Sequence, residues 1–146
     1  MEGIGRDIMY AIARAQKALY RLIREDAARV GITEVQLIVL YTLLKKEHIR
    51  LHDLAEKLNL SNSNVSGTVD RLVSAGLVVR EPSKRDRRAV ILSLTEKGKE
   101  TVLAAFGEQS VLRQRLQRIQ ELISPEEIEQ FLRLQEKVKT ILLGEE

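Results

Sequence analysis

Residues 60–88 read LSNSNVSGTVDRLVSAGLVVREPSKRDRR, and this stretch decides the fold of the chain. Its first half carries apolar residues at helical spacing: Val65, Val69, Leu72 and Val73. Ser61 stands where a helix N-cap is expected, and Gly76 stands where a helix can end in the left-handed conformation. The stretch therefore predicts a helix between these two residues, followed by a short strand and an arginine-rich turn.

The outward face of the predicted helix carries small polar residues instead of the Glu and Lys that usually cover a solvated helix. These residues are poorer helix formers, which indicates that the face serves a contact. Small hydrogen-bonding side chains let a helix approach DNA closely and read base edges in the major groove. An ordinary polar surface is the alternative interpretation. The predicted major-groove residues are Asn62, Ser63, Asn64, Ser66, Gly67 and Arg71.

Two β-branched, apolar runs at 77–81 and 89–94 predict the strands of a hairpin. The tip between them supplies the predicted wing residues: Lys84, Arg85, Asp86, Arg87 and Arg88. Arginine is favoured in a narrow minor groove, where the negative potential of DNA is focused. Because phosphates repel Asp86, its predicted role is to brace Arg88 in an extended pose. A solvated charged turn is the alternative.

Three helices are predicted before this stretch. Residues 4–30 carry one apolar stripe and end at Gly31. A capping box formed by Thr33 and Gln36 starts a second helix, whose sequence LIVLYTLL is apolar on nearly all sides and should be central. A short helix over 52–58 would precede the recognition helix and complete a helix-turn-helix. With the hairpin behind it, this unit is a winged helix.

His48 and His52 are four residues apart, a spacing that metal sites on helices use. The chain has no cysteine and no third histidine. A helix boundary is also expected between the two histidines. We therefore predict a surface loop at this point and no metal site.

After the wing, Thr95 is predicted to cap a helix that runs to Ile123, about 40 Å at 1.5 Å per residue, with a possible bend at Gly107. Ser124 and Glu127 form a second capping box, which starts a last helix. The predicted fold class is mainly α: a winged helix-turn-helix with about six helices and a small β-hairpin wing.

The long terminal helices carry more apolar surface than the compact centre can cover. A two-fold dimer through the N- and C-terminal helices would bury this surface. It would also place two recognition helices about 34–36 Å apart, one turn of DNA. Within one integrated domain, we assign residues 1–32 to an N-terminal dimerisation helix, 33–98 to the DNA-binding region and 99–146 to the C-terminal dimerisation helices.

Charge is unevenly distributed along the chain. The net charge is +3 overall, and the positive excess lies in residues 50–99, around the predicted DNA-binding stretch. This distribution favours a nucleic-acid partner.

Several other function classes find no support in the sequence. Without cysteine there are no disulfides and no thiolate redox sensor. No apolar run is long enough for a membrane span, and the N-terminus lacks the pattern of a signal peptide, so we expect a cytoplasmic protein. No nucleophile–base pair, metal cluster or Gly-rich phosphate loop is visible, so we expect neither an enzyme nor a cofactor.

Seven short motifs occur in order over residues 33–98: Thr33-x-x-Gln36, Leu54-Ala55, Ser61-x-Ser63-x-Val65-Ser66, Val69-Asp70-Arg71-Leu72, Gly76-Leu77-Val78 with Arg80, Asp86-Arg87-Arg88, and Leu94-Thr95-x-Lys97-Gly98. In this order and spacing they resemble the MarR (multiple antibiotic resistance regulator) family of winged-helix transcription regulators. Each motif alone is weak, but the combination is specific. The flanking helices are similar in length and placement rather than in sequence.

The resemblance implies a homodimer that binds a pseudo-palindromic DNA operator, usually as a repressor. Many family members release DNA when a small phenolic or lipophilic molecule binds, although some regulators have no effector. The family's wing residues fall on Arg88, as the minor-groove probe, and Asp86, as its support. The chain departs from the pattern at Arg50, where the family usually has a Ser or Thr helix cap. A winged-helix module that binds another protein instead of DNA is the second hypothesis, and the four basic residues of the wing tip argue against it.

Overall fold

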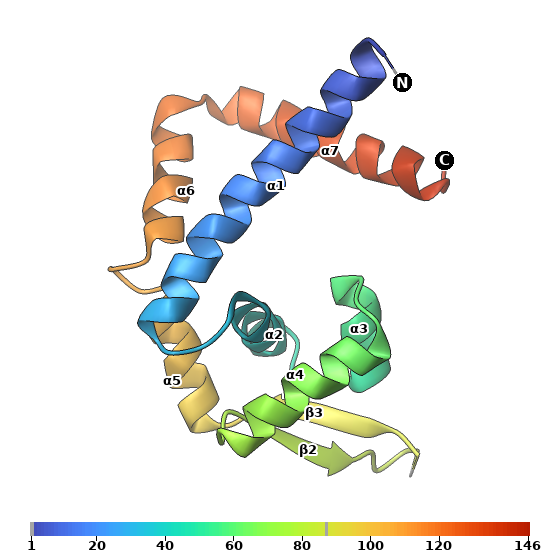
Figure 1. Cartoon of the computed structure of the whole chain (residues 1–146), viewed down its shortest axis with the longest axis vertical. Helices are drawn as coiled ribbons and strands as arrows, with labels where there is room; N and C mark the ends of the chain where they lie inside the picture. The colour runs from blue at the N-terminus through green and yellow to red at the C-terminus, as the bar shows by residue number, and fades with distance from the viewer. Residues whose placement is uncertain (1, 87) are drawn as a thin grey trace. The chain divides into compact units, whose positions relative to one another are not determined.

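The computed structural model describes residues 2–86 and 88–146 and divides the chain into two compact units, Met1–Leu112 and Arg113–Glu146 (Figure 1). Arg87, one of the predicted wing residues, lies outside the described residues.

The first unit begins with a long helix, α1 (Ile4–Arg29), which stops before Gly31 at a φ of 79°. The next helix, α2 (Glu34–Lys45), starts at the predicted capping box. The Thr33 hydroxyl accepts a hydrogen bond from the Gln36 N–H at 3.2 Å, and the Gln36 side chain accepts one from the Thr33 N–H at 2.9 Å. Figure 1 shows α2 surrounded by the other elements of this unit, as its apolar sequence predicts.

The helix-turn-helix consists of α3 (Leu51–Leu58) and α4 (Asn62–Ser74). The turn between them places Asn59 in the left-handed conformation, with a φ of 53°. Ser61 caps α4 by accepting a hydrogen bond from the Asn64 N–H at 3.1 Å. At the other end of α4, Gly76 has a φ of 75°, which confirms the predicted helix stop.

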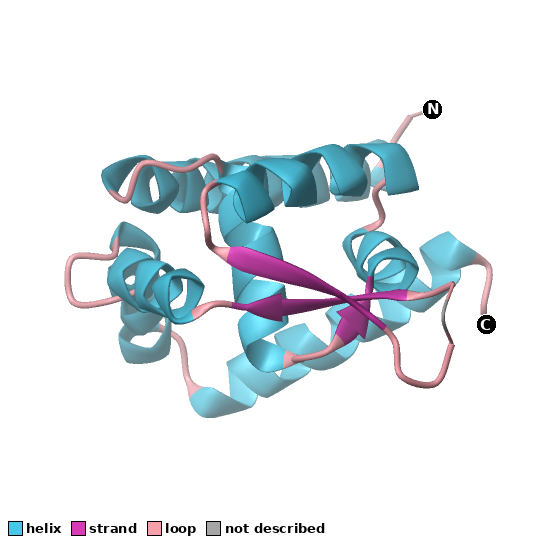
Figure 2. Ribbon diagram, turned by 90° about the horizontal axis from the view of Figure 1, so that it is seen from below, coloured by secondary structure: helices cyan, strands magenta, loops and turns pink. Residues whose placement is uncertain are grey.

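The wing is part of a sheet with three strands instead of two (Figure 2). The predicted hairpin is formed by β2 (Val78–Pro82) and β3 (Val90–Leu94), which pair antiparallel from Val78 opposite Leu94 to Pro82 opposite Val90. A further strand, β1 (Ile49–Arg50), pairs with the other edge of β3. Since β1 has only two residues, no alternation in the sequence could reveal it.

The core of the first unit is aliphatic and lies between α2, the helix-turn-helix, the sheet and α5 (Glu96–Ala105). Its fully buried side chains include Leu40, Leu43, Leu54, Val65, Val69, Leu72 and Leu92. A smaller cluster joins Ile23 and Ala27 of α1 to Leu37 of α2 and Ala105 of α5. Only the C-terminal part of α1 is therefore covered, and Ile8 and Leu19 remain 45% and 42% exposed.

The prediction of one continuous helix from Thr95 to Ile123 is wrong. Helix α5 ends at Ala105, and α6 (Val111–Leu122) begins after a turn that contains Gly107 and Ser110. The described residues thus form seven helices, one more than predicted. A buried carboxylate from α1 holds the start of α6, and this interaction explains the break, as described below.

The second unit contains the rest of α6 and all of α7 (Pro125–Leu143). The predicted capping box is present, because Ser124 accepts from the Glu127 N–H at 3.2 Å and Glu127 accepts from the Ser124 N–H at 3.2 Å. Helix α7 ends at Gly144, which has a φ of 70°. None of its side chains is buried within the chain.

No single helix among the described residues is long and apolar enough to cross a membrane. The pair α1 and α2 meets the length and composition test only when joined, across a bend of 88°.

Candidate nucleic-acid interface

Helix α4 turns one face to the core and the other outward. Val65, Val69 and Leu72 are completely buried, which fixes the rotation of the helix about its axis. Five of the six predicted major-groove residues lie together over the first two turns of α4, and Arg71 follows one turn later. Asn62, Ser63, Asn64 and Arg71 are exposed, and Ser66 and Gly67 are half-buried. A Cβ at Gly67 would meet no atom within 4 Å, so the protein itself does not require glycine there.

The C-terminal end of α4 is held by residues at the start of α5. The Thr95 hydroxyl donates to the Gly76 carbonyl at 2.6 Å, and the Lys97 ammonium donates to the Ala75 carbonyl at 3.1 Å. These bonds satisfy carbonyls that a helix end leaves without partners. Gly98 allows this close approach, since a Cβ there would lie 2.1 Å from the Leu77 carbonyl oxygen.

A second attachment joins α4 to the wing. Arg80 on β2 forms an ion pair with Asp70 on α4, with 2.5 Å between Arg80 Nη1 and Asp70 Oδ1. Its other terminal nitrogen donates to the Ser66 carbonyl at 3.4 Å. Asp70 and Arg80 both occur in the family motifs quoted above, but neither was predicted to have a role in the site. The structure brings both residues together with the predicted recognition residues.

The described residues of the wing tip form hydrogen bonds within the turn and carry exposed basic side chains. The Ser83 hydroxyl accepts from the N–H groups of Arg85 and Asp86, both at 3.3 Å. Asp86 Oδ1 accepts from the Arg88 N–H at 3.0 Å. Asp86 therefore contacts the main chain of Arg88. The side chains of Lys84, Arg85 and Arg88 are exposed.

The region before α3 contains two of the sequence features discussed above. His48 adopts a φ of 60°, and its Nδ1 lies 3.0 Å from the Ser93 hydroxyl, so it links the β1 end of the sheet to β3. Arg50 occupies the N-cap of α3 without a side-chain hydrogen bond to the helix. Helix α3 therefore begins without a side-chain hydrogen bond from its N-cap residue.

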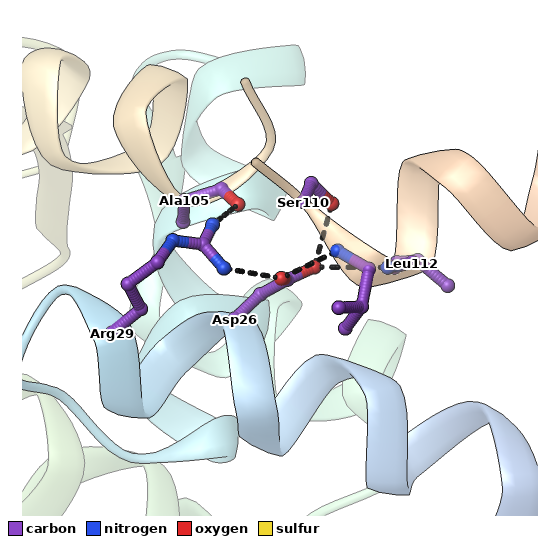
Figure 3. Close-up of polar contacts among 6 residues, drawn as sticks. Asp26, Arg29, Ala105, Ser110 and Leu112 are labelled. Atoms are coloured by element: carbon purple, nitrogen blue, oxygen red, sulfur yellow. Dashed lines mark hydrogen bonds and ion pairs between the residues drawn. The ribbon is translucent and has the colours of Figure 1, made fainter. Parts of the chain in front are cut away.

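A buried polar cluster centred on Asp26 of α1 is a feature that was not predicted from the sequence (Figure 3). Its carboxylate accepts hydrogen bonds from the Ser110 hydroxyl at 2.6 Å and from the Arg29 guanidinium at 2.8 Å. It also accepts from the N–H groups of Val111 and Leu112, at 2.9 and 3.2 Å. Arg29 donates in turn to the Ala105 carbonyl at the end of α5, at 2.7 Å. The cluster therefore joins α1 to the end of α5 and the start of α6.

Asp26 is charged in this setting. Burial raises the pKa of its carboxyl, but the hydrogen bonds from Ser110, Arg29, Val111 and Leu112 outweigh burial and hold the pKa below its ordinary value of 3.8. One signal in the sequence could have indicated this cluster, because Asp26 lies on the same side of the helix as the apolar residues Ile23 and Ala27.

Residues 32–90 match the model of the MarR family. A curated relative, the uncharacterized HTH-type transcriptional regulator YfiV of Bacillus subtilis, is 40% identical over 99 residues. That alignment covers 68% of this chain and 60% of YfiV, so the chain matches less than two thirds of its relative's length.

Two solved structures with DNA share the fold. The transcriptional repressor CouR bound to a 23-mer DNA duplex superposes with a TM-score of 0.74 at 29% identity, covering 89% of this chain and 90% of CouR. A mutant MarR from E. coli complexed with operator DNA gives a TM-score of 0.78 at 25% identity, covering 94% of this chain and 99% of MarR.

Proposed function

Because this chain belongs to the MarR family, we propose that it is a dimeric, sequence-specific DNA-binding transcriptional regulator that acts as a repressor at a pseudo-palindromic operator. One observation carries the proposal: a single compact unit presents a helix with an outward face of small polar residues beside a hairpin tip with exposed basic residues. CouR and MarR, which share this fold, have been solved with DNA.

In this proposal α4 enters a major groove. Ser63, Asn64 and Arg71 are exposed there and could reach base edges or phosphates, and Gly67 permits close approach of the helix. The wing enters a neighbouring minor groove, where Arg88 is the probe and Asp86 fixes its main chain. The remaining contacts are assigned to Asn62, Ser66, Lys84, Arg85 and Arg87.

A second copy of the chain supplies the second recognition helix. Apolar side chains are exposed on the N-terminal part of α1, including Ile4 and Ile8, and on α7, including Phe131 and Leu142. Soluble monomers rarely leave so many large apolar side chains uncovered. We assign these two surfaces to the dimer interface.

Three features of the proposal extend beyond DNA binding. A small lipophilic or phenolic molecule is the proposed effector that releases the operator. We also place the protein in the cytoplasm, where the operators of its bacterial relatives lie, and assign it no catalytic role.

The deciding experiment is selection of duplexes by the full-length protein from a random DNA library, followed by fluorescence-polarisation titration. We expect the selected duplex to contain an inverted repeat and to bind at least about 10³-fold more tightly than random duplex at physiological salt. The logarithm of the affinity should fall steeply with the logarithm of salt concentration, since several phosphates are neutralised. Equal affinity for selected and random duplexes would favour the alternative function, a winged-helix module that binds another protein.

A further inference from the structure

Helix α4 carries an acidic side chain on its outward surface. Asp70 follows Ser63 and Gly67 at helical spacing, so it lies near the face that the proposed function turns toward DNA. Its side chain is 59% exposed. A carboxylate so placed would be repelled by phosphates, and DNA binding would be weakened unless its charge were compensated.

Arg80 provides that compensation from a different element. Its guanidinium lies 2.5 Å from the Asp70 carboxylate and donates to the Ser66 carbonyl at 3.4 Å. Ser66 and Asp70 are one helical turn apart, and the planar guanidinium bridges these two residues on adjacent turns of α4. The side chain of Arg80 is only 35% exposed, which indicates that it lies along the helix.

The position of Arg80 in the sheet gives this contact a second consequence. On β2, Arg80 is paired with Leu92 of β3, whose side chain is completely buried in the core. The next two residues of β2, Glu81 and Pro82, lead directly to the wing tip. A contact between Arg80 and α4 therefore connects the recognition helix to the base of the wing, while Thr95 and Lys97 hold only the end of that helix.

We propose that Arg80 is a positioning residue for DNA recognition, which neutralises Asp70 and ties the recognition helix to the wing so that both reach DNA as one body. The inference rests on the proposed function, since it concerns the same DNA-binding surface. It differs from a direct role in which Arg80 contacts a phosphate or a base independently of Asp70. In the direct role, Asp70 would only compete with DNA for the guanidinium.

A double-mutant cycle on the full-length protein separates the two roles. The four proteins are the wild type, Arg80→Ala, Asp70→Asn and the double variant, each titrated with the duplex that the wild type selects. We expect Arg80→Ala to lower affinity about 10-fold or more in the wild-type background, because an unpaired carboxylate then faces DNA. In the Asp70→Asn background, Arg80→Ala should lower the affinity for the duplex by less than about 3-fold.

Two results would overturn the inference. If Arg80→Ala costs the same factor in both backgrounds, Arg80 acts on DNA independently of Asp70. If the cost is larger in the Asp70→Asn background, Asp70 restrains Arg80 from binding DNA. Thermal unfolding followed by circular dichroism checks that each variant is folded, and an exposed pair of this kind is expected to shift the unfolding free energy only slightly.

Hydrogen exchange in the absence of DNA tests the mechanical part of the inference. Both Arg80→Ala and Asp70→Asn should accelerate exchange of the amides of β2 and of residues 66–70 relative to the wild type. Unchanged exchange in both variants would show that the pair does not tie α4 to the wing. If the wild type selects no duplex, the proposed function fails, whereas the exchange result still reports on the contact between α4 and β2.

Discussion

Asp26 and Ser110 are joined by a hydrogen bond of 2.6 Å, although they lie 84 positions apart in the sequence, and both side chains are completely buried. The same carboxylate receives the first N–H groups of α6, from Val111 and Leu112. Asp26 therefore performs for α6 what a local N-cap performs for other helices, and its negative charge suits the positive end of the helix dipole. This interaction explains why α5 ends at Ala105 and a new helix, α6, begins at Val111.

Replacing Asp26 by Asn should destabilise the protein strongly. The neutral amide keeps the size of the side chain but presents an NH₂ group among donors, so at least one buried donor loses its partner. We expect the free energy of unfolding to fall by about 3 kcal/mol, the low end for a broken buried pair because Arg29 is 29% exposed. Urea unfolding measures this loss. Glu25→Gln is the control, since the neighbouring Glu25 side chain is half-exposed. It should change the free energy of unfolding by less than about 0.5 kcal/mol.

The contribution of Asp26 should also depend on pH in a defined direction. Its pKa in the folded protein lies below the ordinary 3.8, so the unfolded chain takes up the proton first as the pH falls. The stabilisation is complete above about pH 5 and is lost as the pH falls through 3.8 toward the folded pKa. The difference in unfolding free energy between wild type and Asp26→Asn should shrink over this window, and a difference that is constant down to pH 3.5 would contradict the lowered pKa.

These features show which parts of the fold local sequence can predict. The capping boxes at Thr33 and Ser124 and the stop at Gly76 depend on residues within one turn, so the sequence indicates them correctly. The break between α5 and α6 depends on Asp26, which is distant in sequence, and β1 exists only because β3 offers it an edge. Neither feature has a local signal strong enough to predict it.

Two glycine substitutions should have opposite effects on stability. Gly67→Ala places a methyl group in open space within a helix, so the protein should gain about 0.5–1 kcal/mol of stability. Gly98→Ala forces a Cβ against the Leu77 carbonyl oxygen, and it should cost about 1–3 kcal/mol or more. If α4 enters the major groove closely, Gly67→Ala should nevertheless weaken DNA binding. Unfolding midpoints measure the stability of both variants, and polarisation titrations measure the DNA affinity of Gly67→Ala. Unchanged DNA affinity would argue against close approach at Gly67.

The basic side chains of the wing lead to a prediction about DNA affinity. Arg88→Ala should weaken binding to the selected duplex by about 1–3 kcal/mol, because an exposed guanidinium is removed from a turn that Asp86 holds in place. Lys137→Ala, which removes an exposed cation from α7, is the matched control and should leave the affinity nearly unchanged. Equal affinity of Arg88→Ala and the wild type would exclude the minor-groove role.

Part of the recognition surface could also be predicted from the sequence, because it depends on residues close together in the chain. Helical periodicity assigns Ser63 and Gly67 to the outward face from the sequence alone. The pair formed by Asp70 and Arg80 joins a helix to a strand, so their separation along the chain carries no pattern that indicates contact. A helical wheel shows Asp70 on the outward side, but only the packing of β2 beside α4 shows why it is tolerated there.

The exposed apolar residues of α7 lead to a prediction about dimer formation. Phe131 and Leu142 lie on one side of this helix and are 57% and 70% exposed within the chain. If a second copy covers them, Phe131→Glu and Leu142→Glu together should bury two carboxylates in an apolar interface and dissociate the dimer. Sedimentation equilibrium should then report a mass near 16.6 kDa instead of twice that value.

Lys137→Glu is the control for this experiment, since it introduces the same side chain at a polar, exposed position of α7. It should leave the dimer intact, which shows that added negative charge alone does not separate the copies. The monomeric double variant should also bind the selected inverted repeat more weakly, because only one recognition helix then contributes at a time. A double variant that remains dimeric would remove α7 from the interface and leave the exposed apolar residues of α1 as the remaining candidate surface.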